Sequence, residues 1–272
     1  MIGIVLGNYK LVDLIGDGGM GKVFKAEHLE TNELVAIKAL PKEFYNDTTY
    51  EIRFKREVEA VRRLDHPHIL PLITYGETDE TSYIVLPLMT NGTLREKLEW
   101  GKFSYEECLR LMMQLGSAID HAHDHQIIHR DLKPANIMFD ENDNIQLTDF
   151  GIAKLIEDTP SDITGSAVIG TWHYMSPEQS MGQKDITTQT DIYSLGIILH
   201  EMLSGRTPFH DNSPSQIINR HMTMKLSMAD DLDDHLSPEI KFVILKALAR
   251  LPRQRHKNGI AMAKALQRAL EG

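Results

Sequence analysis

The chain has 272 residues, 42% of them hydrophobic and 25% charged, which is typical of a soluble globular protein with a sizeable core. Its formal net charge of −10 argues against nucleic acid as a partner, because nucleic-acid-binding proteins present a basic face. The single cysteine, Cys108, excludes an intrachain disulfide and falls within a helical pattern, where a buried structural thiol is expected.

The sequence contains no signal for a membrane or for secretion. No apolar run approaches the ~18 residues that a membrane span requires. The N-terminus lacks the basic segment of a signal peptide, and Gly3 is not the second residue, as myristoylation would need. We therefore expect a cytoplasmic protein without a membrane segment.

The first third of the chain is predicted to be rich in strands. Residues 51–64 have apolar positions at helical spacing and are predicted to form the one helix of this region. Alternating apolar residues between turn signals predict strands at 9–15, 23–28, 34–39, 69–74 and 82–86.

After residue 92 the pattern becomes mostly helical. A hairpin is expected with strands at 137–139 and 145–148, across a polar turn. Helices are predicted at 105–125, 191–204, 213–222, 238–248 and 260–270. The sequence therefore predicts an α+β protein in which a small strand-rich lobe precedes a larger helical lobe.

Gly16, Gly18 and Gly21, followed by Val23, fit the pattern G-x-G-x-x-G-x-V. Glycine lets a backbone approach phosphate oxygens closely and direct its N–H groups at them. A dinucleotide-binding fold is the alternative, but it would place a helix directly after the glycines, whereas residues 23–28 alternate like a strand. An ordinary hairpin turn remains a third interpretation of this motif alone.

Glu57 lies close to the apolar face of the predicted helix 51–64, and a carboxylate there needs a cationic partner. Lys38, at the end of the preceding strand, is the natural one. A surface salt bridge is the weaker interpretation, since such pairs contribute only ~0–1 kcal/mol. Glu59 points away from the apolar face and is the less favoured acid.

Two further motifs follow in the second half of the chain. They are His129-Arg130-Asp131-Leu132-Lys133-Pro134-Ala135-Asn136 and, across the predicted hairpin, Asp149-Phe150-Gly151. With the glycine motif and Val35-Ala36-Ile37-Lys38 they stand in an order that chance rarely produces. In these motifs the chain resembles the catalytic domains of protein serine/threonine kinases, bacterial members in particular, over essentially all of its length.

The resemblance implies a bilobal protein-kinase fold over residues 1–272. An antiparallel sheet and one helix would form the N-terminal lobe, about 1–87, and a hinge at about 88–92 would lead to the mainly helical lobe, about 93–272. The chain ends with its last predicted helix, so we expect either a free-standing kinase or the kinase part of a membrane-anchored one.

The resemblance also implies an enzyme that transfers phosphate from ATP to serine and threonine hydroxyl groups of proteins. Asp131 would be the base that deprotonates the hydroxyl, a contribution of ~10²–10⁴-fold in rate. Lys133 would neutralise charge on the transferring phosphoryl group. Asn136 and Asp149 would bind Mg²⁺, with Mn²⁺ as an alternative.

ATP is expected to bind between the lobes. Lys38, held by Glu57, would contact the α- and β-phosphates. The Pro87 carbonyl and the Met89 N–H would bind adenine, although Thr90 replaces an acidic residue that often contacts ribose. The residues that the resemblance assigns to ATP binding are Ile15, Gly16, Gly18, Gly21, Val23, Ala36, Lys38, Leu86, Pro87, Met89 and Met138.

The segment after Asp149 is expected to carry regulation. Phosphorylation of Thr164 or Ser166 would order it through charge pairing with Arg130. Thr171 would instead lie near the catalytic base and shape the substrate site. The expected partners are protein substrates and a second copy of the chain, as a homodimer for trans-autophosphorylation.

Three structural roles follow from the same resemblance. Glu178 and Arg255 are expected to form a buried ion pair, Asp191 to anchor the catalytic loop (residues 129–136), and Phe150 to pack between the lobes.

Other functions compete with this interpretation. A pseudokinase scaffold would lack ATP turnover, and a small-molecule kinase would usually lack Lys133 in this context. A metal site formed by the histidines is discounted, because neighbours two apart on a helix do not face one side. Those histidines are His121, His123, His125 and His129.

Overall fold

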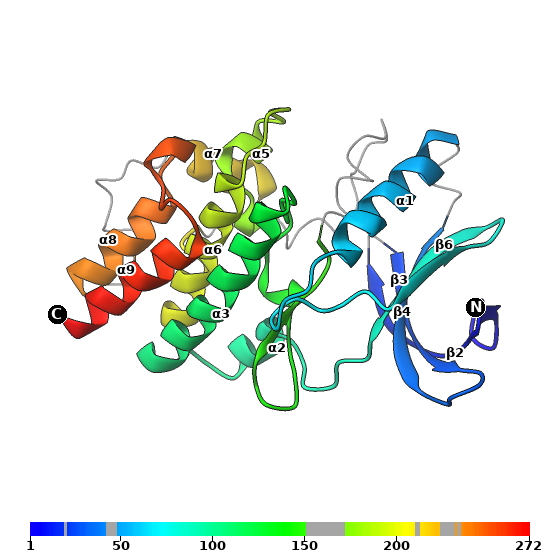
Figure 1. Cartoon of the computed structure of the whole chain (residues 1–272). Coiled ribbons are helices and arrows are strands. Elements are labelled where there is room, and N and C mark those ends of the chain that lie inside the picture. The colour runs from blue at the N-terminus through cyan, green and yellow to red at the C-terminus, as the bar shows by residue number, and fades with distance from the viewer. Residues whose placement is uncertain (19–20, 42–47, 151–171, 210–212, 224–231, 233–234) are drawn as a thin grey trace.

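The protein has two lobes, which lie side by side in Figure 1. This computed structural model describes residues 1–18, 21–41, 48–150, 172–209, 213–223, 232 and 235–272. One lobe holds a β-sheet and helix α1 (Thr48–Arg62), and the other holds the remaining helices. The predicted α+β class with a small strand-rich lobe and a larger helical lobe is confirmed.

The N-terminal lobe is built on a six-stranded sheet with the order β1-β2-β3-β4-β6-β5. Every neighbouring pair of strands is antiparallel. The strands are β1 (Val5–Leu6), β2 (Tyr9–Gly18), β3 (Gly21–His28), β4 (Leu34–Pro41), β5 (Thr74–Glu77) and β6 (Thr81–Pro87). The strands predicted at 9–15, 23–28, 34–39 and 82–86 are confirmed.

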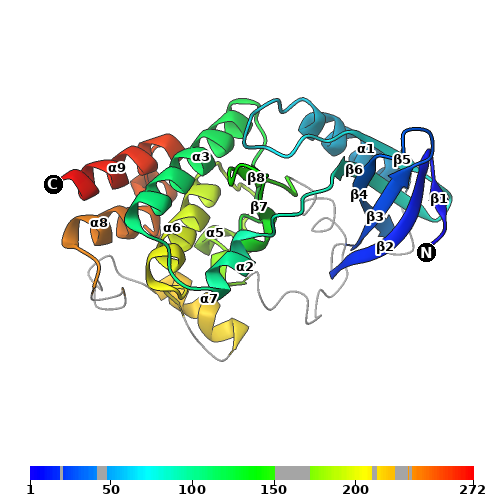
Figure 2. The same cartoon turned by 90° about the horizontal axis from the view of Figure 1, so that it is seen from below.

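The strand predicted at 69–74 is wrong, because regular pairing begins only at Thr74. The residues before it bind the β7–β8 hairpin of the helical lobe instead. Leu70 N donates to Leu147 O at 2.9 Å, and Leu147 N donates to His68 O at 3.0 Å. This hairpin, β7 (Ile137–Phe139) and β8 (Ile145–Leu147), lies between the helices and the sheet in Figure 2.

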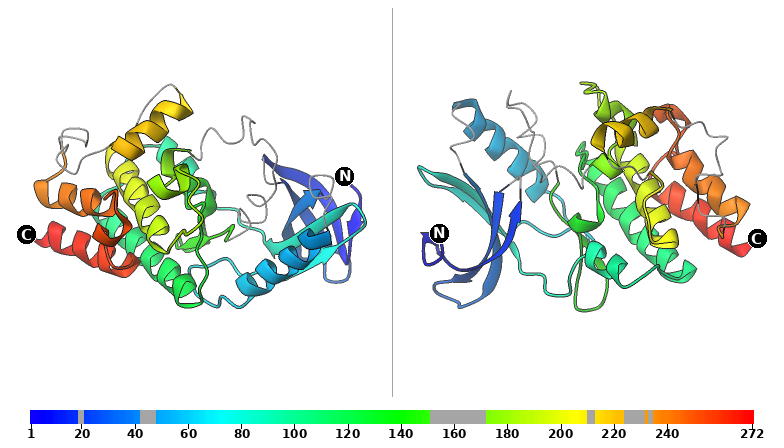
Figure 3. Two further views of the ribbon diagram at one scale, coloured as in Figure 1. Left: turned by 90° about the horizontal axis from the view of Figure 1, so that it is seen from above. Right: turned by 180° about the vertical axis from the view of Figure 1, so that it is seen from behind.

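Helix α1 packs against the sheet through a small apolar core (Figure 3). Phe54 and Val58, four residues apart and so on one side of the helix, are buried against Leu40 and Ile84. The helix predicted at 51–64 is therefore confirmed, with a start three residues earlier.

The helical lobe surrounds α6, whose residues from Thr190 to Leu203 are all buried. Its helices are α2 (Leu94–Glu99), α3 (Tyr105–Asp124), α5 (Pro177–Ser180), α6 (Gln189–Ser204), α7 (Pro214–Thr223), α8 (Pro238–Ala247) and α9 (Gly259–Glu271). Short 3₁₀ turns are η2 (Pro134–Asn136), η4 (Trp172–Tyr174) and η6 (Pro252–Gln254). The five predicted helices and the hairpin of this lobe are confirmed.

Helices α3 and α9 cross at two glycines. A Cβ atom on Gly259 would lie only 2.7 Å from the Cα of Gly116, so the two backbones touch where they cross. Asp120 on α3 accepts hydrogen bonds from the N–H groups of Gly259 (2.7 Å) and Ile260 (3.0 Å). The carboxylate thereby satisfies donors that the first turn of α9 leaves open.

Cys108 is buried on α3, as expected, and burial raises the pKa of its thiol to about 12. Within the described ranges, no helix combines the length and the apolar character needed to cross a membrane.

Candidate active site

The glycine motif forms a hairpin. Gly16 pairs with Val23 and Gly18 pairs with Gly21, so a strand follows the glycines, which contradicts a dinucleotide-binding fold. Gly21 has a φ of +123°, and a side chain there would overlap a carbonyl oxygen of β4. The close packing of β3 on β4 therefore requires this glycine, whatever the loop binds.

One face of the sheet collects several of the residues predicted around ATP. Val23 lies opposite Lys38, Lys38 opposite Ile84, and Ala36 opposite Leu86. Directly paired residues share a face of a sheet, as do residues two apart on one strand. All five side chains therefore project from the same face, which α1 covers at Ile84.

The other predicted adenine contacts lie around the connection to the helical lobe. Pro87 ends β6, and Met89 follows it, partly buried. Met138 on β7 forms a bridge with Thr93, and Ile15 near the end of β2 is half exposed. Their contacts with a nucleotide stay predictions.

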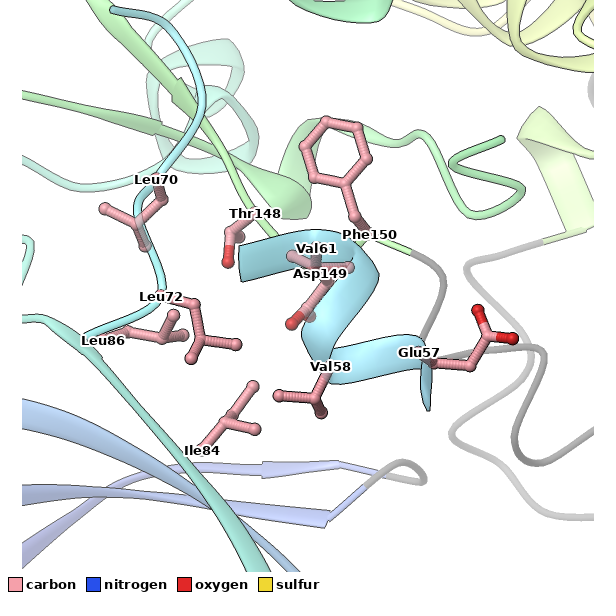
Figure 4. A pocket seen from close by; sticks show the side chains of 10 residues that line it. All are labelled: Glu57, Val58, Val61, Leu70, Leu72, Ile84, Leu86, Thr148, Asp149 and Phe150. Carbon is pink, nitrogen blue, oxygen red and sulfur yellow. The ribbon is translucent and has the colours of Figure 1, made fainter. Parts of the chain in front are cut away.

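A small cavity, partly open to solvent, lies between α1, β6 and residues 148–150 (Figure 4). Leu86, one of the predicted adenine contacts, lines this cavity. The cavity therefore adjoins the predicted ATP site at Leu86. Its lining residues are Glu57, Val58, Val61, Leu70, Leu72, Ile84, Leu86, Thr148, Asp149 and Phe150.

Lys38 and Asp149 form an ion pair across the two lobes, with Nζ 2.8 Å from Oδ1. Lys38 is only 6% exposed and the Asp149 side chain 22%, so the pair is largely shielded from water. Burial raises the pKa of Asp149, but the charge and hydrogen bond of Lys38 outweigh burial and hold that pKa below its ordinary value.

The predicted pair between Lys38 and Glu57 is wrong for this structure. Among the ion pairs of the described residues, Lys38 has Asp149 as its partner, and Figure 4 shows the Glu57 side chain extending away from Asp149. Val58 fills the small core and is 3% exposed. Glu57, about 100° further round the helix, is left at the edge of that apolar face.

The Asp131 carboxylate is buried and held on one side. Its Oδ2 accepts from Lys133 Nζ at 2.8 Å and from Asn136 Nδ2 at 3.2 Å. Its Oδ1 is also buried, and no donor among the described residues contacts it. Because a buried carboxylate oxygen without a donor is costly, this atom is suited to accept a hydrogen bond from a bound group.

Asp191 holds the backbone of the catalytic loop from α6, as expected. Its carboxylate accepts from the N–H groups of His129 and Arg130, each at 2.9 Å, and from His123 Nε2 at 2.8 Å. Arg130 adopts a φ of +66°, so these bonds fix a strained backbone just before Asp131. Burial raises the pKa of Asp191, but the bond from His123 and the backbone donors hold it below its ordinary value.

His129 connects the catalytic loop with the segment that carries Asp149. Its Nε2 donates to the carbonyl of Thr148 at 2.9 Å, and its ring lies 4.7 Å from that of Phe150. Phe150 is buried and also lines the cavity beside α1, as expected for packing between the lobes. These two contacts link the loop that carries Asp131 to the residues on either side of Asp149.

Comparison with known families decides among the interpretations of these motifs. The family model described as "Protein kinase domain" matches residues 9–268. The chain belongs to the protein kinase family. The match confirms the resemblance and, with the two lobes, the bilobal protein-kinase fold.

Similar proteins are bacterial kinases. The chain is 38% identical to serine/threonine-protein kinase PrkC of Bacillus subtilis over 98% of this chain and 41% of that protein. It is 35% identical to PknB of Mycolicibacterium smegmatis, covering 97% and 43% of the two chains. For PknH of Mycobacterium tuberculosis the identity is 33%, covering 99% and 43%. The kinase domain thus spans about two-fifths of the length of these relatives.

The donor set of the kinase domain suits a divalent cation that prefers oxygen. Asn136 uses its Nδ2 to bind Asp131, which leaves its Oδ1 as the ligand atom, and Asp149 offers a carboxylate. Within the described residues no group of three or more His, Cys, Asp or Glu is arranged to hold a metal ion. His123 and His129 bind Asp191 and Thr148 instead.

The predicted regulatory residues Thr164, Ser166 and Thr171 lie outside the described residues. The part of this segment that is described begins at Trp172. It is fastened beside the catalytic loop, because Gln179 Nε2 donates to Arg130 O at 2.7 Å.

The predicted buried ion pair between Glu178 and Arg255 is confirmed. Two guanidinium nitrogens of Arg255, Nη1 and Nη2, donate to the carboxylate, at 2.7 and 2.8 Å. Burial raises the pKa of Glu178, but the bonds and charge of Arg255 outweigh it and hold the pKa below its ordinary value.

Sequence reasoning missed a second charged network under the same segment. Arg95 on α2 binds both Tyr174 and Glu201, and Tyr174 OH donates to the Glu201 carboxylate at 2.6 Å. Glu201 on α6 is 4% exposed. The apolar pattern of α6 indicates that Glu201 is buried. Its partners Arg95 and Tyr174 lie in distant elements, and no sequence motif marks them.

Proposed function

We propose that this kinase domain transfers the γ-phosphoryl group of ATP to serine and threonine hydroxyl groups of proteins. The observation that carries the proposal is the buried Asp131 Oδ1, which no described donor contacts, while Lys133 and Asn136 hold Oδ2. A hydroxyl group that donates to Oδ1 would be held in place and made ready for attack on the phosphate. The names of the relatives support the same acceptor class.

Each residue of the site has a part in this proposal. Asp131 accepts the proton of the hydroxyl group, and Lys133 balances negative charge on the transferring phosphoryl group. Asn136 and Asp149 bind Mg²⁺, or Mn²⁺ in its place, which when bound neutralises charge on the phosphates. Lys38, beside Asp149, contacts the phosphates under the glycine hairpin.

We further propose that the kinase phosphorylates a second copy of itself on Thr164 or Ser166, in the cytoplasm. The added charge then pairs with Arg130 and orders the segment. Alanine at both positions is expected to reduce activity towards an added acceptor, and unchanged activity would refute this part of the proposal.

The test of the main proposal is incorporation of labelled phosphate from MgATP into the protein and a generic protein acceptor, with the modified residues mapped. We expect incorporation on serine or threonine that falls at least ~10²-fold in Asp131→Asn, because the base is lost. Asp124→Asn, an exposed aspartate at the end of α3, is the matched control and is expected to keep full activity.

The alternatives give different results in the same assay. ATP binding without incorporation, equal for wild type and Asp131→Asn, indicates a scaffold. Incorporation into a metabolite pool but into no protein indicates a small-molecule kinase.

A further inference from the structure

A buried histidine on α7 touches the segment that follows the predicted regulatory residues. His221 Nε2 lies 3.1 Å from the carbonyl oxygen of Trp172, the first residue of η4. On the other side of the ring, Nδ1 lies 2.6 Å from the hydroxyl oxygen of Tyr193 on α6. Both ring nitrogens therefore have partners, although His221 is only 2% exposed.

The partners determine where the protons are. A carbonyl oxygen can only accept, so Nε2 of His221 must carry hydrogen and donate it to Trp172. In the neutral ring Nδ1 is then an acceptor, and Tyr193 donates to it. Burial lowers the pKa of His221 to about 4, so the ring is neutral at pH 7 and this direction of donation is fixed.

Packing alone does not explain a histidine here. Helix α7 attaches through Ile217 and His221, four residues apart, while Gln216 and Arg220 are exposed. Phe209 packs edge-on against the His221 ring at 4.6 Å, so an apolar side chain would suit the surroundings. A buried polar ring is costly unless its bonds are made, and here they hold one backbone carbonyl.

The segment that His221 holds lies beside the catalytic base. Residues 172–180, η4 and α5, bind Arg130 O through Gln179 Nε2 at 2.7 Å, one residue before Asp131. Ser194 on α6 holds the same segment through the Tyr174 carbonyl at 2.8 Å. Residues 172–180 are therefore fixed next to the loop that carries Asp131, and under the proposed activity a protein acceptor whose hydroxyl group reaches Asp131 would bind beside them.

We propose that Tyr193 and His221 are positioning residues, which fix the Trp172 backbone and thereby set the affinity for the protein acceptor. The inference rests on the proposed protein kinase activity. Neither residue is placed at the ATP site, so the Michaelis constant (KM) for the acceptor changes on mutation while the KM for ATP does not.

The test compares three variants in steady-state kinetics with a peptide acceptor and MgATP. Tyr193→Phe removes the hydroxyl alone, and loss of one buried hydrogen bond should raise the peptide KM about fivefold. His221→Leu removes both bonds and should raise it at least as much. His221→Gln keeps an N–H donor for the Trp172 carbonyl. Unlike His221→Leu, it should therefore leave the peptide KM within about twofold of the wild-type value.

Tyr75→Phe is the matched control, because it removes a hydroxyl that binds Glu59 in the other lobe. It should leave the peptide KM unchanged. Equal changes in the two KM values, or no change in Tyr193→Phe, would overturn the inference. If His221→Leu does not fold, the peptide KM values of Tyr193→Phe and His221→Gln still test the inference.

Amide hydrogen exchange of residues 172–176 separates this inference from the proposed function. Faster exchange in Tyr193→Phe than in wild type supports the positioning role, and unchanged exchange contradicts it, whether or not the chain phosphorylates a protein. A wild-type chain that phosphorylates no protein contradicts the proposed function alone.

Discussion

Buried carboxylates of the helical lobe stay charged because donors surround them. Asp191 accepts three hydrogen bonds, and Glu178 accepts two, from Nη1 and Nη2 of Arg255. Asp149, between the lobes, depends on Lys38. In each case burial alone would favour the neutral acid, so the donors decide the charge.

Asp191→Asn is expected to destabilise the protein and to reduce its activity. The two carboxylate oxygens of Asp191 accept from the N–H groups of His129 and Arg130, whereas asparagine has only one side-chain oxygen. Its NH₂ group must therefore face one of these N–H groups, which places two donors against each other. We expect a loss of about 3 kcal/mol of unfolding free energy, measured by urea denaturation. Asp124→Asn serves again as the exposed control, and equal stabilities of the two variants would contradict this account.

Cys108 is expected to be inert in the folded protein. Its thiol is buried and its pKa is raised to about 12, so almost no thiolate is present at pH 8. A thiol reagent should label nothing in native buffer and one equivalent in denaturant. Rapid labelling under native conditions would show that this part of α3 opens.

Motifs predicted some residue partners and not others. The anchoring by Asp191 and the Glu178–Arg255 pair were expected from the family resemblance and are confirmed. The partner of Lys38 was not predictable, because helical periodicity places Glu57 near a face of α1 but does not fix the rotation of α1 on the sheet. His221 was missed because nothing in its local sequence indicates Trp172 or Tyr193 as partners.

At the level of elements, the crossing of α3 and α9 depends on two absent side chains. Gly259→Ala places a Cβ atom 2.7 Å from Gly116 Cα, and backbone atoms there have little room to move. We expect a loss of about 1–3 kcal/mol from overpacking, seen as a lower urea midpoint. Gly272→Ala, whose Cβ would lie 3.6 Å from the nearest atom, should change little. Equal midpoints would show that the helices separate without cost.

Element positions were predictable where the chain carries local signals. Ser104 caps α3 and Glu107 returns the bond to the cap, a pattern that marks this helix start in the sequence. The strand predicted at 69–74 failed because an extended apolar run does not indicate its partner. It binds Leu147 in the other lobe, and only the tertiary fold supplies that contact.

At the scale of the molecule, stability is expected to fall as the pH drops below about 6.5. The pKa of His221 is about 4 in the folded chain and ordinarily about 6.5, so the unfolded chain binds more protons between these values. The contribution of the neutral His221 ring to the free energy of unfolding is complete above pH 6.5. It declines as the pH falls through 4, by about 3 kcal/mol in all. The lowered pKa values of Asp149, Glu178 and Asp191 act in the same direction at lower pH.

Urea denaturation at pH 7, 6, 5 and 4.5 measures this dependence. His221→Gln should show a smaller decline than wild type between pH 6.5 and 4.5, because its side chain does not titrate. Parallel curves would mean that other groups cause the acid sensitivity.

At the sequence level, only the family resemblance indicates how the two lobes pack together. Composition and periodicity predict a strand-rich and a helical region but not how the two meet. One polar contact through which they meet is Lys38–Asp149, which joins residues 111 positions apart in sequence. The residues just before β5, which bind the β7–β8 hairpin, also connect the two lobes.

The burial of Cys108 has a practical consequence for observing motion between the lobes. The chain has one native thiol, and it is sealed in the core, so it need not be removed before spectroscopic labels are attached. Cysteines introduced at Ile52 on α1, 72% exposed, and at Trp100 after α2, 86% exposed, would accept labels selectively. The distance between such labels would report directly how far the two lobes open and close when a nucleotide is added.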